Sequence, residues 1–140
     1  MKTKMIVYWT CTMIIVLELL AGGVTELLHG RALLVVGDPV VQVIVHLGYP
    51  VYLLTILGCW KLLGAIALLV PRFPRLKEWA YAGTFFNMTG AAASWALNGD
   101  SADNFIWPLI VAILVIVSWA LRPQSRTLGA LFFKWKRIHR

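Results

Sequence analysis

Four long apolar stretches limit what this chain of 140 residues can fold into. They cover about residues 5–28, 49–70, 78–97 and 105–121, and each is close to the length of about 20 residues that a helix needs to cross a bilayer. Only 14% of the residues are charged, against roughly 25% in a soluble domain. The sequence therefore predicts an all-α protein, a four-helix transmembrane bundle that forms one domain over residues 1–121.

The basic residues predict how the bundle is oriented. The chain has 13 Lys and Arg residues and a formal net charge of +7. Two lie before the first apolar stretch, three between the second and third, and six after the fourth: Lys2, Lys4, Arg72, Arg75, Lys77, Arg122, Arg126, Lys134, Lys136, Arg137 and Arg140. By the positive-inside rule, this pattern predicts cytoplasmic termini and a protein of the bacterial inner membrane. It also makes nucleic acid an unexpected partner.

The two ends of the chain allow different interpretations. The N-terminus resembles a signal peptide, but Glu18 interrupts its apolar run, so a retained first helix is predicted. Residues 122–140 form a predicted basic, amphipathic cytoplasmic tail. This tail either lies on an anionic lipid leaflet, where each basic residue contributes about 1 kcal/mol, or is solvated.

The connection between the first two stretches predicts a short helix. Asp38 followed by Pro39 is typical of a helix start, and residues 40–47 are too few to cross a bilayer. We therefore expect an interfacial helix on the outer side. Asp38, Gln42 and His46 share one face of it, which either covers a cavity as a lid or points to water and headgroups.

Charged residues inside the apolar stretches are the first candidates for a functional site. At 1.5 Å per residue, Glu18 and Lys61 lie about 15 Å and about 16 Å from the outer ends of their helices, and so at similar depth. Their charges are predicted to face each other or to meet through water. Gly58 and Gly64, on either side of Lys61, indicate that this face packs against protein.

The third stretch presents small and polar residues on one helix face, namely Gly83, Asn87, Gly90 and Ser94. Asn87 lies near the depth estimated for Lys61, where its amide can hydrogen-bond the lysine or a ligand.

Further polar residues complete the predicted site. Thr25 and Glu26 continue the stripe beyond Glu18 toward the outer boundary, and His46 lies on the polar face of the short helix. The candidate ligand-binding residues are therefore Glu18, Lys61, Asn87, Ser94, Thr25, Glu26 and His46. Together they either bind a small molecule or only fix how the helices pack.

No motif points to a metal or to a tightly held cofactor. The three histidines are scattered, and HExxH, CxxC, nucleotide-loop and nucleophile-elbow patterns are absent from the sequence. No catalytic residue is assigned. Cys11 and Cys59 lie at depths that differ by more than the ~7 Å limit of a disulfide, so two free cysteines are predicted.

Three strings resemble the DoxX-like family of small membrane proteins: "YW" with the following Thr10, the block from "LGYPVYLL" to "KEWAYAG" at residues 47–83, and "GAAAS". The resemblance covers roughly residues 8–100 and implies a four-helix membrane fold. The family takes its name from a membrane subunit associated with a thiosulfate:quinone oxidoreductase, and some relatives are linked to oxidative stress. Members often carry an acid at the position of Asn87 and a histidine at that of Trp95, and this chain departs from both.

These observations favour a membrane protein that binds a quinone or a lipid-like molecule, or supports a partner redox enzyme. Lys61 would hold a carbonyl or anionic head, oriented by Glu18 and Asn87. One alternative is a membrane subunit of a quinone-linked oxidoreductase, with Glu18 exchanging protons beside the quinone and a redox centre on a partner chain. Another is a structural or assembly subunit, and a homo-oligomer is also open.

Overall fold

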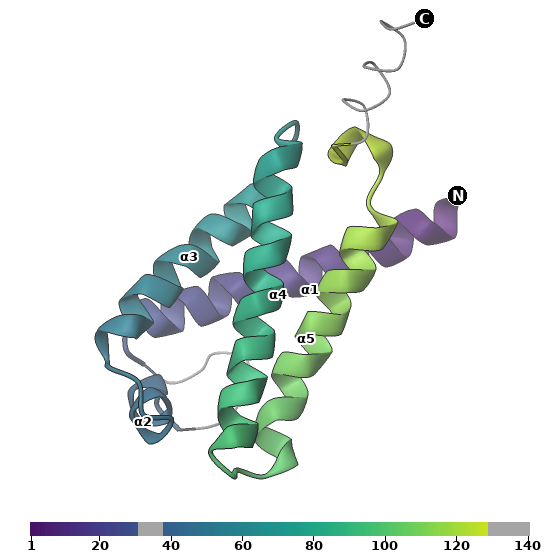
Figure 1. Ribbon diagram of the computed structural model, residues 1–140. Helices are drawn as coiled ribbons and strands as arrows, with labels where there is room; N and C mark the ends of the chain where they lie inside the picture. The colour runs from purple at the N-terminus through teal and green to yellow at the C-terminus, as the bar shows by residue number, and fades with distance from the viewer. Residues whose placement is uncertain (31–37, 129–140) are drawn as a thin grey trace, which may run out of the picture.

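The computed structural model of the protein describes residues 1–30 and 38–128 (Figure 1). This part of the chain is helical and has no strand. Its helices are α1 (Lys2–Leu27), α2 (Val40–His46), α3 (Tyr52–Leu69), α4 (Pro74–Leu97), α5 (Ala102–Leu121) and a short 3-10 turn, η1 (Gln124–Arg126). The all-α prediction and the short helix after Pro39 are confirmed. The predictions for residues 129–140 of the tail fall outside the described residues.

Three of these helices, α1, α3 and α5, are long and apolar enough to cross a membrane. The remaining long helix, α4, has 24 residues and a length of about 36 Å at 1.5 Å per residue. Its polar side chains make it less apolar, so a fourth span stays a prediction. α4 begins at Pro74, ahead of the predicted start, because proline fits the first turn of a helix, where its missing N–H costs no hydrogen bond.

The long helices pack in an ordered arrangement in which α3, α4 and α5 lie side by side while α1 crosses behind α4 and α5 (Figure 1). α1 packs against α3 and α5, and α4 packs against the same two helices. The α3–α4 turn and the end of α5 lie at one end of the bundle, with α2 and the α4–α5 turn at the other (Figure 1). The most buried apolar side chains of the core are Ile15, Val16, Leu19, Ala65, Leu68, Val111 and Val115.

Two glycines bring the backbones of α1 and α3 into contact. A Cβ atom on Gly58 would lie 2.9 Å from the carbonyl oxygen of Gly23 and 2.8 Å from the Cγ of Leu27. Only residues without a side chain allow helices to approach this closely. The predicted packing of this face against protein is therefore confirmed at Gly58, whereas a Cβ on Gly64 would sit at an ordinary 3.7 Å from Leu19.

A buried lysine closes the end of α3. Lys77 is only 1% exposed, and its Nζ donates to the carbonyl oxygens of Ala67 at 2.8 Å, of Leu68 at 2.9 Å, and of Val70. Arg126 adds a hydrogen bond from Nη1 to the carbonyl of Leu68 at 3.1 Å. The last carbonyls of a helix have no partner within it and carry the negative end of its dipole, so these cations stabilise α3. The sequence assigned Lys77 only to the charge pattern, and this capping role was missed.

A buried hydroxyl network joins three helices near the same end. The Oγ of Ser118 in α5 lies 2.8 Å from the Oγ1 of Thr12 in α1 and 2.9 Å from the hydroxyl of Tyr81 in α4. All three side chains are buried. Because each hydroxyl finds a partner, these polar groups hold the helices in register at little desolvation cost.

The glycine contact leads to a stability prediction. Gly58→Ala is expected to lower the free energy of unfolding in detergent by about 1–3 kcal/mol, because the new Cβ must push aside a backbone carbonyl. Gly90→Ala is the matched control, since a Cβ there meets nothing within 4 Å and alanine favours helix by about 1 kcal/mol over glycine. Chemical unfolding followed by circular dichroism measures both variants, and equal stabilities would contradict the contact.

Candidate functional site

A groove of about 480 Å³ lies between α3 and α4 and brings together two of the predicted site residues, Lys61 and Asn87. Most of its lining is apolar, with Leu19 of α1 at its floor and Thr84 as a further polar residue. The complete lining is Leu19, Leu57, Trp60, Lys61, Leu63, Gly64, Ala67, Leu76, Trp79, Ala80, Gly83, Thr84, Phe86 and Asn87. An apolar cleft with few polar groups is typical of a site for a small amphiphilic ligand.

Glycines and aromatic rings shape this groove. Gly83 faces open space, because a Cβ built there meets no atom within 4 Å. At the rim, Trp60, Trp79 and Phe86 are 67%, 76% and 70% exposed. The groove therefore opens sideways, at the outer surface of α3 and α4 rather than toward α1.

An ion pair holds the head of Lys61 on the side of α3 that packs against α1. The Nζ of Lys61 donates to the Oε1 of Glu26 at 2.5 Å, and both side chains are only 12% exposed. The ammonium fits beside Gly22, where a Cβ would lie 3.1 Å from Nζ. The aliphatic stem of Lys61 therefore lines the groove, while its ammonium group is paired with Glu26.

The direct partner of Lys61 is Glu26, which the sequence placed in the site but did not pair with the lysine. Glu18 lies beside the same glycine as the lysine head, with its Oε1 3.7 Å from a Cβ built on Gly22. Its Oε2, however, accepts a hydrogen bond from Trp107 Nε1 at 3.2 Å. The depth estimate compared backbone positions along each helix. A lysine side chain is long and flexible, so its head can reach a carboxylate two turns farther along α1.

The other two candidates on α1, Thr25 and Glu26, do not line the groove. Thr25 is buried, and it donates from Oγ1 to the carbonyl of Ala21 in its own helix at 2.7 Å. The second carboxylate oxygen of Glu26, Oε2, is buried and has no hydrogen-bond partner among the described residues. Glu26 therefore depends on Lys61 for its charge balance.

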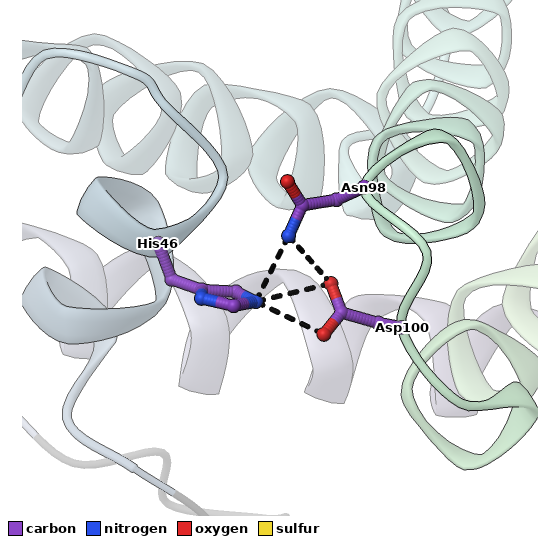
Figure 2. A network of polar contacts seen from close by, with 3 residues as sticks. All are labelled: His46, Asn98 and Asp100. Carbon is purple, nitrogen blue, oxygen red and sulfur yellow. Dashed lines mark hydrogen bonds and ion pairs between the residues drawn. The ribbon is translucent and has the colours of Figure 1, made fainter.

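Two predicted site residues, His46 and Ser94, make polar contacts outside the groove, and those of His46 with Asn98 and Asp100 lie at the α2 end of the bundle (Figure 2). The Nε2 of His46 lies 2.9 Å from Oδ1 of Asp100, and Asn98 donates from Nδ2 to Oδ2 of Asp100 at 2.9 Å. Ser94 shares a hydrogen bond with the hydroxyl of Tyr49 at 2.8 Å. These contacts fasten α2 and the start of α3 to the C-terminal end of α4.

The polar face of α4 therefore contributes side chains both to the groove and to a contact with Tyr49. Gly83 and Asn87 line the groove, whereas Ser94, farther along the same face, reaches Tyr49. Trp95 lies beside His46, with 5.8 Å between ring centres. The residues predicted to form one site are thus divided between the groove and the α2 end of the bundle. The contacts of His46, Asn98 and Asp100 at that end are called the clasp below.

The next groups to consider are the cysteines and the side chains that could bind a metal ion. Cys11 is buried and Cys59 is exposed, and both are free, as predicted. Across residues 1–30 and 38–128, no three His, Cys, Asp or Glu side chains come together as a metal site.

The described residues are helical, with three apolar helices of spanning length and an ion pair enclosed between two of them. These features define an integral membrane protein. It belongs to the DoxX-like family, whose sequence profile matches residues 10–118, from early α1 to near the end of α5. The resemblance expected from the sequence is confirmed and extends farther along the chain. No curated protein and no solved structure matches it.

The ion pair predicts non-additive substitutions. Lys61→Met alone should lower the free energy of unfolding by about 3–5 kcal/mol, because it leaves the Glu26 carboxylate buried without a counter-charge. Lys61→Met combined with Glu26→Gln should recover most of that loss. Denaturant titrations of both variants in detergent measure the coupling. If the double variant loses at least as much as the single one, the pair does not act as described.

The clasp predicts a pH-dependent contact. Hydrogen bonds from Asn98 and His46 hold the pKa of Asp100 below its ordinary value. A lowered pKa stabilises the fold above the ordinary aspartate pKa, and the contribution is lost as the pH falls through the folded-state value. Hydrogen exchange of the α2 amides should therefore be slower in wild type than in Asp100→Asn near pH 7.

This difference should begin to shrink as the pH falls below the ordinary aspartate pKa of about 3.9, and it should vanish below the lowered folded-state pKa of Asp100, where the carboxylate is protonated in the fold. Asp103→Asn, in the first turn of α5, is the control and should match wild type throughout. A difference between wild type and Asp100→Asn that persists unchanged in acid would contradict the clasp.

Proposed function

We propose that the protein binds a quinone or a lipid-like amphiphile in the groove between α3 and α4. The observation that carries this proposal is the cavity of about 480 Å³, which is mostly apolar but contains Lys61 and Asn87 at mid-height. Ligand pockets typically enclose about 300–1,000 Å³ and combine apolar walls with a few polar groups that fix orientation.

The polar groups have the chemistry that a carbonyl-bearing head requires. Asn87 offers two N–H donors and a carbonyl acceptor, and the Lys61 ammonium has three donors, one of which bonds Glu26. Thr84 donates its hydroxyl to the carbonyl of Ala80, so it adds little polarity to the groove. In the proposed complex, Asn87 orients the ligand's oxygen, while the stem of Lys61 lines the groove and its ammonium stays paired with Glu26.

The sideways opening supports a ligand that arrives from the lipid phase. The exposed rings of Trp60, Trp79 and Phe86 stand at the rim, on the face of α3 and α4 that α1 leaves uncovered. A molecule that partitions into the bilayer meets this rim directly, whereas a water-soluble metabolite would have to cross lipid to reach it.

The same proposal includes four spans with both termini in the cytoplasm of a bacterium. α4 packs between α3 and α5 and is joined to each by a turn of only a few residues, at opposite ends of the bundle (Figure 1). If α3 and α5 cross the bilayer, this path carries α4 across it in the reverse direction. The end that holds the α3–α4 turn is the more basic one, which supports a cytoplasmic location.

Filling the groove tests the proposed binding. Gly83→Leu places a side chain in open groove space without a clash of its Cβ, and Gly90→Leu makes the same change in α4 away from the groove. Titration of the purified protein with decylubiquinone should show affinity at least about 10-fold weaker for Gly83→Leu, equal to about 1.4 kcal/mol. Mass spectrometry of co-purified lipids and quinones gives a second readout.

Gly90→Leu should bind as wild type does, and thermal unfolding should confirm that both variants are folded. Equal binding and equal co-purified ligand in the two variants would refute the groove as the site.

A further inference from the structure

A second cavity, of about 540 Å³, lies at the α3–α4 turn, at the end of the bundle opposite α2 (Figure 1). Two arginines, Arg72 and Arg75, line it together with Phe73, Leu76 and Trp79. Its lining combines two positive charges with exposed apolar side chains, which separates it in chemistry from the groove that holds Lys61 and Asn87.

No acidic side chain pairs with the positive charge of this cavity among residues 1–30 and 38–128. All six acidic residues of the sequence fall within the described part of the chain, and none forms an ion pair with Arg72 or Arg75 there. Glu78, the acid nearest in sequence, is paired with Arg122 and also accepts a hydrogen bond from Trp119. The two guanidinium groups are therefore available for an external anion.

Arg72 occupies its position at a conformational cost. Its φ is +77°, in the left-handed region, which costs an L-residue with a side chain roughly 1–2 kcal/mol relative to the right-handed region. Glycine would adopt the same conformation freely. Replacing Arg72 by glycine thus removes the charge while relieving the backbone, which makes it a clean experimental change.

The apolar part of the cavity continues into the neighbouring groove. Leu76 and Trp79 line both spaces, and Phe73 and Trp79 are 58% and 76% exposed. A ligand with an anionic head at the arginines can therefore lay a hydrocarbon chain along these side chains. Arginine forms paired, charge-assisted hydrogen bonds with phosphate oxygens, and indole rings favour the boundary between headgroups and hydrocarbon.

We propose that the cavity at the α3–α4 turn binds the headgroup of an anionic phospholipid, with Arg72 and Arg75 contacting the phosphate and Leu76 and Trp79 contacting the acyl chain. This site is distinct from the proposed amphiphile groove, and neither proposal depends on the other. A free phosphate would use the two arginines but would leave the exposed apolar side chains without a role.

Native mass spectrometry of the purified protein with added phosphatidylglycerol or phosphatidylcholine tests this site. Wild type should retain phosphatidylglycerol in preference to phosphatidylcholine. A contribution of about 1 kcal/mol from each basic residue near an anionic lipid corresponds to a loss of about 5-fold in affinity for Arg72→Gly, and about 30-fold for Arg72→Gly with Arg75→Gln.

The control is Lys2→Gln with Lys4→Gln, which removes the same charge from exposed positions at the start of α1. It should keep the preference for phosphatidylglycerol, and millimolar inorganic phosphate should not displace the lipid. The proposal is overturned if the control loses as much as the arginine variants, if Arg72→Gly binds as wild type does, or if inorganic phosphate displaces the lipid. Because Arg72→Gly relieves the backbone, a loss of fold does not explain its effect.

Discussion

A charged side chain in the middle of an apolar helix needs a counter-charge, and the pairing of Lys61 with Glu26 determines how α1 and α3 meet. Lys61 of α3 and Glu26 of α1 project from different depths along the bundle, so the lysine side chain extends along the surface of α1 to reach the carboxylate. Gly22 leaves room for the ammonium, and the contact of Gly23 with Gly58 brings the backbones close enough for the pair to form. Charge pairing and close packing therefore support each other at one contact between two helices.

This contact also explains where the groove lies. Because α1 covers the face of α3 that carries the paired ammonium, the neighbouring face of α3 is left to α4. There the glycines at positions 64 and 83 leave the volume that the lining side chains enclose. The lysine thus belongs to two environments, with its charge enclosed between α1 and α3 and its stem exposed to the groove. A ligand near Asn87 would experience a neutralised pair rather than an isolated positive charge.

The sequence predicted the helices, the packing face around Gly58 and a similar depth for Lys61 and Asn87, which line one groove. It could do so because helix periodicity and depth depend only on positions along the backbone. It did not identify Glu26 as the lysine's partner, since that choice depends on how a flexible side chain bends. Nor did it reveal Lys77 as the cap of α3, because the carbonyls concerned belong to a different helix and become unpaired only where that helix ends. Ser94 was placed on the correct face of α4, but one face of a long helix passes through more than one environment.

The enclosed ion pair has a consequence for how the chain enters the membrane. α1 is synthesised before α3, so the carboxylate of Glu26 reaches the bilayer first, and Lys61 follows with the second of these helices. Lys61 lies near the middle of α3, where an unpaired charge opposes insertion by a few kcal/mol, whereas its pair with Glu26 is closer to neutral. The helices therefore gain most by entering as a pair, and a ribosome that delays between them would leave α1 with an acid that has no cation to meet. The order of the elements along the chain is in this sense part of the folding mechanism.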